Sequence, residues 1–427
     1  MKYSIFLILL TLLSNCQPNK EIHLPDLDAI GRKCDAYRED GSNSKAAQLY
    51  FETGQNLGSS ELFVYAAWQF GKANMPDSAL IAVNYAIDNG MSNPKVLDGW
   101  SIDQMTEKSA LRRKIDKRLD SIQISLENID NFEIILDPMN TFWSYFDAAI
   151  ADTTKAKELL SEYILKGSPA IKDYYHIRYE NVDNMYRTMI LKNPDFYKYL
   201  KNAVSEEQLN EVAIESKQMM VQFAKLYPRA VFPKTYIVPD LINSSGTLTE
   251  LGLYVGLTMF AKSENMPQQN LNNWQLSTIT EFDNMKFDLV HELMHYQQSY
   301  SDEENENLLL GKLIREGACD FLVSLLTEKH EMSQAVNRRL DYINDPKIWA
   351  VVLEELKRDL YGQDLSKWMH NGGGIKDRPS NLGYTVGYLI CKSFYDNSAD
   401  KKQAVYELLN TDNFKKIIEE SEYNEIL

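Results

Sequence analysis

Apolar residues recur every three or four positions through the first third of the chain, which is the spacing of amphipathic helices. The pattern is clearest in AAQLYFETGQ (46–55), ELFVYAAWQFGKA (61–73) and DSALIAVNYAIDNG (77–90). Pro76 separates the second stretch from the third, and Gly90 stands where a glycine commonly ends a helix. The pattern predicts helices, which we assign to a segment at 44–128.

The two helices on either side of Pro76 resemble one tetratricopeptide-type repeat, with KANMPDSALIAVNYAIDNG across the turn. Residues 97–122 resemble the segment that often closes such repeats in bacterial proteins. Repeats of this kind usually need about three copies for stability, and one copy is convincing here. Two interpretations therefore stay open: a repeat-like module, or helices that only brace the next domain.

Short β-branched and aromatic runs mark the second part of the chain. FEIIL (132–136), KTYIVPDL (234–241) and GLYVGLTMF (252–260) are strand candidates. The turn-rich INSSGTLTE between the last two predicts a hairpin or a pair of neighbouring strands. Helical patterns dominate the rest, so we expect an α+β fold in which a mostly helical domain at 129–427 carries a small sheet.

The start of the chain has the pattern of a bacterial lipoprotein. Lys2 precedes an apolar run of signal-peptide length, which is too short to span a bilayer. The run ends in LSNC at Cys16 and resembles a lipobox, so 1–16 predicts a lipoprotein signal peptide with a lipidated Cys16. The polar residues 17–43 predict a tether. A secretory signal that contains a cysteine is the alternative.

A lipid anchor predicts a protein of the bacterial cell envelope, facing the periplasm or the surface, with the outer membrane as the expected location. The net charge of −16 argues against nucleic acid as a partner, because that binding depends on Lys and Arg at phosphates. Cys34, Cys319 and Cys391 remain, an odd number without short spacing, which argues against a disulfide framework or a cysteine zinc site. Cys319 and Cys391 are expected to be buried small apolar side chains.

The strongest chemical signal is VHELMHYQQ at 290–298. On a helix, His291 and His295 project from one face, so two imidazoles can bind one zinc ion. Glu292 lies about 100° around the helix, where it misses the metal and still meets a water beside it. The alternative is a chance arrangement on the face of a helix.

A third ligand is available in LLLGKLIREGACDFLVSLL at 308–326. Glu316 and Asp320 lie four residues apart among apolar residues, where an unsatisfied carboxylate is costly. Zinc bound by Glu316 satisfies one carboxylate, and Asp320 can orient a ligand histidine through its second ring nitrogen. Three protein ligands leave the fourth position open, as in catalytic zinc sites. The alternative is a solvated acidic face.

Hydrolysis also needs a group that stabilises the developing oxyanion. In DRPSNLGYTVGYLICKSFYD (377–396) the candidates are Arg378, Tyr384 and Tyr388. Tyrosines at helical spacing are more often core residues, and Arg378 is more often the partner of a surface carboxylate. Gly383 and Gly387 predict close packing of this helix.

Four blocks occur in a fixed order and carry a resemblance to a known family: AVFPKTYIVPDLINSSGTLTELGLYVGLTMF, FDLVHELMHYQQ, LIREGACDFLVSLL and RPSNLGYTVGYLICKSFYD. Together they resemble zinc-dependent proteases related to a gliding-motility lipoprotein of Bacteroidota-type bacteria, over about 130–420. The resemblance implies a zincin-like fold, Zn²⁺ as cofactor, the ligands His291, His295 and Glu316, and Glu292 as the base. By analogy with zinc peptidases, the strand at 252–260 would border the cleft.

The sequence therefore leads to two hypotheses about function. The first is a membrane-anchored zinc metallopeptidase that acts on a peptide or protein substrate. The second is a non-catalytic envelope lipoprotein that uses the peptidase fold and the helical segment to bind a protein partner in motility or secretion machinery.

Overall fold

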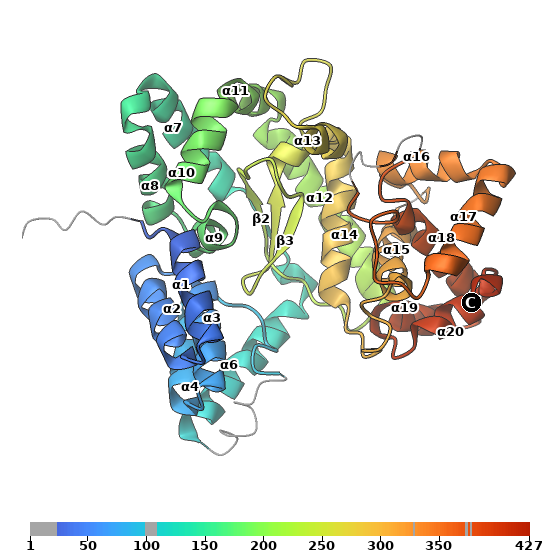
Figure 1. Ribbon diagram of the computed structural model, residues 1–427, viewed down its shortest axis with the longest axis horizontal. Coiled ribbons are helices and arrows are strands. Elements are labelled where there is room, and N and C mark those ends of the chain that lie inside the picture. The colour runs from blue at the N-terminus through green and yellow to red at the C-terminus, as the bar shows by residue number, and fades with distance from the viewer. Residues whose placement is uncertain (1–23, 99–108, 328, 372–374, 376–377) are drawn as a thin grey trace, which may run out of the picture.

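The computed structural model describes residues 24–98, 109–327, 329–371, 375 and 378–427. Cys16, the signal peptide and the first residues of the expected tether lie outside these ranges. The described chain is mostly helical and holds a four-stranded sheet, which agrees with the expected α+β class. In Figure 1 the sheet lies between a lobe built by the N-terminal half of the chain and a lobe of C-terminal helices. None of the helices in the described ranges is both long and apolar enough to cross a lipid bilayer.

The N-terminal part is a helical module, as the periodicity predicts. Its helices are α1 (Leu27–Glu39), α2 (Asn43–Leu57), α3 (Ser60–Lys72), α4 (Pro76–Asp88) and α6 (Ala110–Leu126). The predicted tether at 17–43 is wrong over α1, which buries Leu27 and Cys34 and packs on α2, where Cys34 contacts Ala46. The apolar stripe of α1 is narrow, and charged residues such as Asp28 and Arg32, which form an ion pair one turn apart, dilute it in the sequence.

A second group of helices follows the module and includes two π-helical segments. The elements are α7 (Asp137–Ala151), α8 (Ala156–Lys166), α9 (Pro169–Tyr174), η3 (Tyr175–Tyr179), α10 (Val182–Met185), η4 (Tyr186–Lys192), α11 (Pro194–Ala203) and α12 (Glu206–Leu226). In Figure 1, α7, α8 and α10 lie on the side of the sheet opposite α14 (Met285–Gln297). The sheet is thus covered by helices on both sides.

The sheet has the strand order β1–β2–β4–β3, from β1 (Ile134–Ile135), β2 (Thr235–Val238), β3 (Gly246–Leu248) and β4 (Leu253–Gly256). β2 pairs with β1 and with β4 in parallel, whereas β3 runs antiparallel to β4. β2 and β4 are buried along their whole length, which explains why both read as continuous apolar runs.

β3 lies at the edge of the sheet, within the segment whose residues predict a turn. Its residues, Gly-Thr-Leu, are partly exposed and give no apolar alternation. The strand expected at 252–260 is shorter than predicted, because β4 ends at Gly256 and η5 (Leu257–Phe260) continues from it as a 3₁₀ turn. β4 is an interior strand, and the segment reaches the cavity through Met259 of η5. The strand beside the motif helix is β3.

The C-terminal lobe contains α13 (Asn273–Thr278), α14, α15 (Leu309–Leu325), α16 (Gln334–Ile343), α17 (Pro346–Asp359), α18 (Leu382–Asn397), α19 (Lys401–Asn410) and α20 (Phe414–Glu419). α15 and α18 pack backbone to backbone. A Cβ atom on Gly387 would lie 1.9 Å from the carbonyl oxygen of Leu313, and one on Gly317 would lie 2.0 Å from the carbonyl carbon of Gly387. The close packing predicted from Gly387 is therefore present, and it sets Tyr384 on α18 opposite Glu316 on α15.

Candidate metal centre

Three side chains from two helices converge on one point. His291 and His295 project from one face of α14, and Glu316 faces them from α15. Glu316 Oε2 lies 3.4 Å from His291 Nε2 and 3.1 Å from His295 Nε2. The structure therefore brings together the three residues that the sequence singles out as ligands, although they lie up to 25 positions apart.

These distances fit the donor set of a tetrahedral zinc site. Zinc–nitrogen and zinc–oxygen bonds of about 2.0–2.1 Å place neighbouring ligand atoms roughly 3.3 Å apart. The distances of 3.1 and 3.4 Å from Glu316 to the two imidazoles match that separation. Two imidazoles and one carboxylate are also the donors that catalytic zinc commonly takes.

The outer nitrogen of each imidazole is held by a further side chain. Asp320 Oδ1 lies 2.8 Å from His291 Nδ1, one helical turn beyond Glu316, in the orienting position suggested from the sequence. Gln298 Oε1 lies 2.9 Å from His295 Nδ1, and this orienting role was not predicted from the sequence. The signal for Gln298 is its position three residues after His295. Both contacts direct Nε2 of the rings toward Glu316.

Cys319 is an alternative ligand that the sequence analysis placed in the core. It is fully buried, yet its Sγ lies 3.4 Å from His295 Nδ1, and potential ligand atoms of Cys319, His291 and His295 lie within 4.8 Å of one another. Burial and the nearby carboxylates raise the pKa of the thiol well above its usual value. The thiol lies at Nδ1 of His295, whereas Glu316 lies at Nε2. We therefore assign the three-donor set to Glu316 rather than to Cys319.

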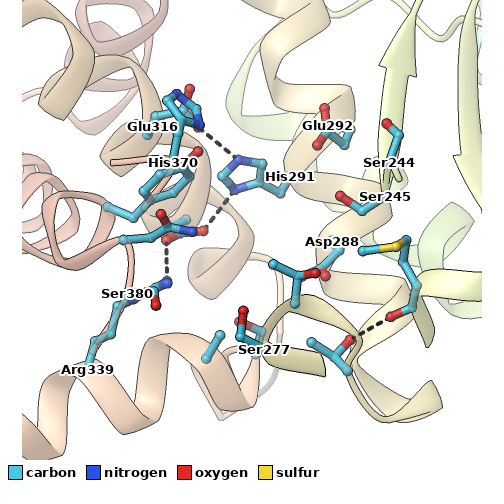
Figure 2. Close-up of a pocket in the computed structure, with 18 of the residues that line it drawn as sticks. Ser244, Ser245, Ser277, Asp288, His291, Glu292, Glu316, Arg339, His370 and Ser380 are labelled. Atoms are coloured by element: carbon cyan, nitrogen blue, oxygen red, sulfur yellow. Dashed lines mark hydrogen bonds and ion pairs between the residues drawn. The ribbon is translucent and has the colours of Figure 1, made fainter. Parts of the chain in front are cut away.

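Glu292 lies beside the donor set and not within it. Figure 2 shows its carboxylate on the side of α14 that faces Ser244 and Ser245. The edge strand packs directly on this side chain, because a Cβ atom on Gly246 would lie 2.4 Å from Glu292 Cδ. A glycine at this place lets the β3 backbone approach the carboxylate, which is thus fixed between strand and helix.

The charges of the centre compensate one another. Burial alone raises the pKa of Glu316, but hydrogen bonds from His291 and His295 outweigh burial and hold that pKa well below its usual range. Burial lowers the pKa of His291, but the carboxylates of Asp320 and Glu316 raise it by more. The pKa of His291 therefore lies well above its usual value. The carboxylates of Asp320 and Glu316, which favour the positive charge on the His291 imidazolium, would favour a bound cation for the same reason.

The three oxyanion candidates do not lie together. Tyr384 lines the cavity, and its ring stacks on His291 with 6.2 Å between centroids. Burial raises the pKa of Tyr384 well above its usual value, so the phenol stays a neutral donor. Arg378 instead pairs with Glu355 and lies over Trp368, and Tyr388 packs against Phe321.

Two charged residues of the cavity were missed by the sequence analysis. Arg339 is buried, lies with its guanidinium over Tyr384, and approaches Asp320 to 3.6 Å. Asp288 precedes His291 by one turn of α14, and burial raises its pKa to about 7. The spacing of Asp288 on the motif helix was a usable signal, whereas nothing in the sequence around Arg339 points to the site. With these residues the centre opens into a cavity of about 770 Å³.

The family model described as Gliding motility protein GldB matches residues 135–425. The matched range begins within β1, contains strands β2 to β4 and every residue of the candidate metal centre, and leaves out helices α1 to α6 of the N-terminal module. No curated protein and no solved structure matches this chain.

Proposed function

The chain belongs to the family of the gliding motility protein GldB, and from the geometry of its site we propose that it is a zinc-dependent peptidase of the cell envelope. The family supports the envelope and lipoprotein context. The observation that carries the proposal is the convergence of two imidazole Nε2 atoms and Glu316 Oε2, with Glu292 adjacent and outside the donor set. A scaffold has no need of a carboxylate in that second position.

His291, His295 and Glu316 would hold the zinc, with a zincin-like fold around them. Zinc at such a site supplies Lewis acidity, which polarises a carbonyl group and lowers the pKa of water. Glu292 takes the proton of the attacking water and returns it to the leaving amine. The neutral hydroxyl of Tyr384 donates to the developing oxyanion, and Asp320 keeps His291 in the orientation that the site requires.

An extended peptide is the substrate class that the surroundings favour. β3 forms the edge of the sheet next to Glu292, and an edge strand can pair with the backbone of a bound peptide. Polar side chains line the cavity, among them Ser244 and Ser245 directly before this strand.

The test compares the wild type with Glu292→Gln and His291→Ala. We expect about one zinc per chain by elemental analysis in the wild type and in Glu292→Gln, and none in His291→Ala. Peptide hydrolysis in a library assay should fall by about 10²–10⁴-fold in Glu292→Gln, because proton transfer is lost while the metal stays.

Glu303→Gln is the matched control, since Glu303 is exposed in the loop before α15 and should retain both zinc and activity. Absence of zinc in reconstituted wild type would overturn the proposal. Zinc binding with equal hydrolysis in wild type and Glu292→Gln would overturn the role of the base.

The family context fits a second function somewhat, that of a non-catalytic lipoprotein of the gliding machinery. Such a protein would bind a protein partner, for which the helical module outside the matched range is the candidate surface. Introduction of Glu292→Gln at the chromosomal locus of the host separates the two. Loss of the envelope phenotype indicates a peptidase, and an unchanged phenotype indicates a partner-binding protein.

A further inference from the structure

The turn between β3 and β4 is held from outside by the helical module. Glu61 Oε1, in the first turn of α3, accepts a hydrogen bond of 2.6 Å from the Glu250 backbone N–H. Ser92, just after α4, donates through its backbone N–H to the Glu250 carbonyl at 2.7 Å. Its hydroxyl donates to the Leu251 carbonyl, also at 2.7 Å. Two separate residues of the module, Glu61 and Ser92, thus hold two consecutive residues of the turn by hydrogen bonds.

The grip is itself anchored to the body of the protein. Asp173 of α9 accepts hydrogen bonds from the Ser60 hydroxyl at 2.5 Å and from the Glu61 backbone N–H at 3.4 Å. Asp173 is fully buried and Glu61 is 5% exposed. The start of α3 is therefore fixed between α9 and the turn, and Glu61 has little freedom to move away from Glu250.

The same hairpin ends at the catalytic side of the cleft. From the turn, β3 runs back along β4 in a register that pairs Leu248 with Leu253 and Gly246 with Val255. Gly246 is the residue whose backbone packs on the Glu292 carboxylate. A displacement of the turn is transmitted along three residues of paired strand to the side chain beside the metal centre.

We propose that the helical module is a positioning element of the site, which uses Glu61 and Ser92 to fix the β3–β4 turn and so keeps the edge strand against Glu292. The module is then neither an independent repeat nor a passive brace. The effect on hydrolysis rests on the proposed function, whereas the effect on the strand does not.

The charges at this junction make the grip sensitive to pH. The titratable groups that face Glu61 are Asp173 of α9, Glu250 of the turn, Tyr65 of α3 and Tyr254 of β4. In the described part of the chain, no cation offsets the effect of these groups on Glu61. Burial, with Asp173 and Glu250, raises the pKa of Glu61 to about 8. If the module separated from the turn, Glu61 would regain its ordinary pKa of 4.5. The binding of the module to the turn therefore weakens as the pH rises from 4.5 to about 8.

Hydrogen–deuterium exchange of the full chain tests this without any substrate. In Glu61→Ala the amides of 246–252 should exchange about tenfold faster, which is the effect of losing one buried hydrogen bond. Glu61→Gln keeps the acceptor and cannot ionise, so it should restore protection and remove its decline between pH 6 and 8. Ser92→Ala should also accelerate exchange. Glu52→Ala and Glu52→Gln, at an exposed carboxylate of α2, are the matched controls and should leave exchange unchanged.

Thermal unfolding of each variant identifies a failure to fold. Unchanged exchange of 246–252 in folded Glu61→Ala and Ser92→Ala would overturn the proposal. So would a pH profile of Glu61→Gln identical to that of the wild type. If exchange responds as expected but wild type neither binds zinc nor cleaves peptides, the positioning role stands and the proposed peptidase function fails.

Discussion

The metal centre and the module junction both bury carboxylates, and they meet the cost of burial in opposite ways. Glu316 faces two imidazoles, which hold its pKa well below the usual range. Glu61 faces Asp173 and Glu250, and burial together with these neighbours raises its pKa to about 8. One cluster keeps its negative charge and attracts cations, whereas the other discards its charge by taking up protons.

The difference assigns different roles to two groups of the same chemistry. A charged carboxylate between two imidazoles supplies the donor types that a zinc ion takes. A carboxylate buried beside other acids is favoured in its protonated form, and its ionisation costs the free energy of burying an uncompensated charge. The first cluster suits chemistry and the second suits a contact that responds to its surroundings.

Removal of Glu316 should have the largest effect and would break the compensated cluster. In Glu316→Ala the two imidazoles keep no carboxylate at Nε2, so zinc content should fall from about one per chain to near zero by elemental analysis. Glu304→Ala, in the exposed loop before α15, is the control and should bind as the wild type does. Equal zinc in both variants would show that another group, such as Cys319, supplies the third donor.

Asp173 tests whether burial at the module junction favours protonated carboxylates. Burial raises the pKa of Asp173 from 3.8 to about 6, so its contribution to stability is present at low pH and is lost as the pH rises through this window. Relative to the wild type, Asp173→Asn should gain up to about 3 kcal/mol of unfolding free energy between pH 4 and 7, measured by urea denaturation. Asp120→Asn, at an exposed site on α6, should show no such gain. If the difference in unfolding free energy between Asp173→Asn and the wild type does not change from pH 4 to 7, the Asp173 carboxylate of the wild type is ionised throughout this range.

Gly387→Ala tests whether the compensated cluster depends on the backbone contact between α15 and α18. The new Cβ would lie 1.9 Å from the Leu313 carbonyl oxygen and force the helices apart, at a cost of about 2 kcal/mol in the free energy of unfolding. Gly31→Ala is the matched control on α1, where a Cβ meets nothing within 4 Å, and should be neutral or stabilising. Equal stability of the two variants would contradict the close packing.

Asp320→Asn should have the smallest effect. Its amide oxygen can still accept from His291 Nδ1, but the charge that favours the metal-bound ring is gone, so zinc affinity should fall about tenfold in a competition titration with a chelator. Asp341→Asn, exposed on α16, is the control. No change in affinity for Asp320→Asn would leave His291 oriented by the fold alone.

The convergence of the three candidate ligands was predictable from sequence because these side chains obey short-range geometry. His291 and His295 share a helical face by spacing, and Glu316 follows on the next helix among apolar residues. Gly387 likewise predicted the close packing of α18, which the structure shows against α15. These inferences depend on helical periodicity, which a single sequence displays directly.

The remaining features depend on contacts between distant segments. Arg339 enters the cavity from α16, and Glu61 meets Asp173 and Glu250 across more than a hundred residues. The edge strand β3 has no alternating pattern, because neither of its faces is fully buried. Arg378 was an apparent candidate by position alone, and its ion pair with Glu355 became visible only in three dimensions.

The parallel pairing of the sheet has a consequence for the newly made chain. β1 can pair only after Thr235 of β2 has been synthesised, because Ile134 pairs with Thr235. The other edge of β2 can pair only after Leu253 of β4 has been synthesised. Until β4 has been synthesised, β2 offers an apolar strand with an unpaired edge, which is a template for aggregation. We expect the nascent protein to depend on a chaperone during this interval, well before any residue of the metal centre has formed.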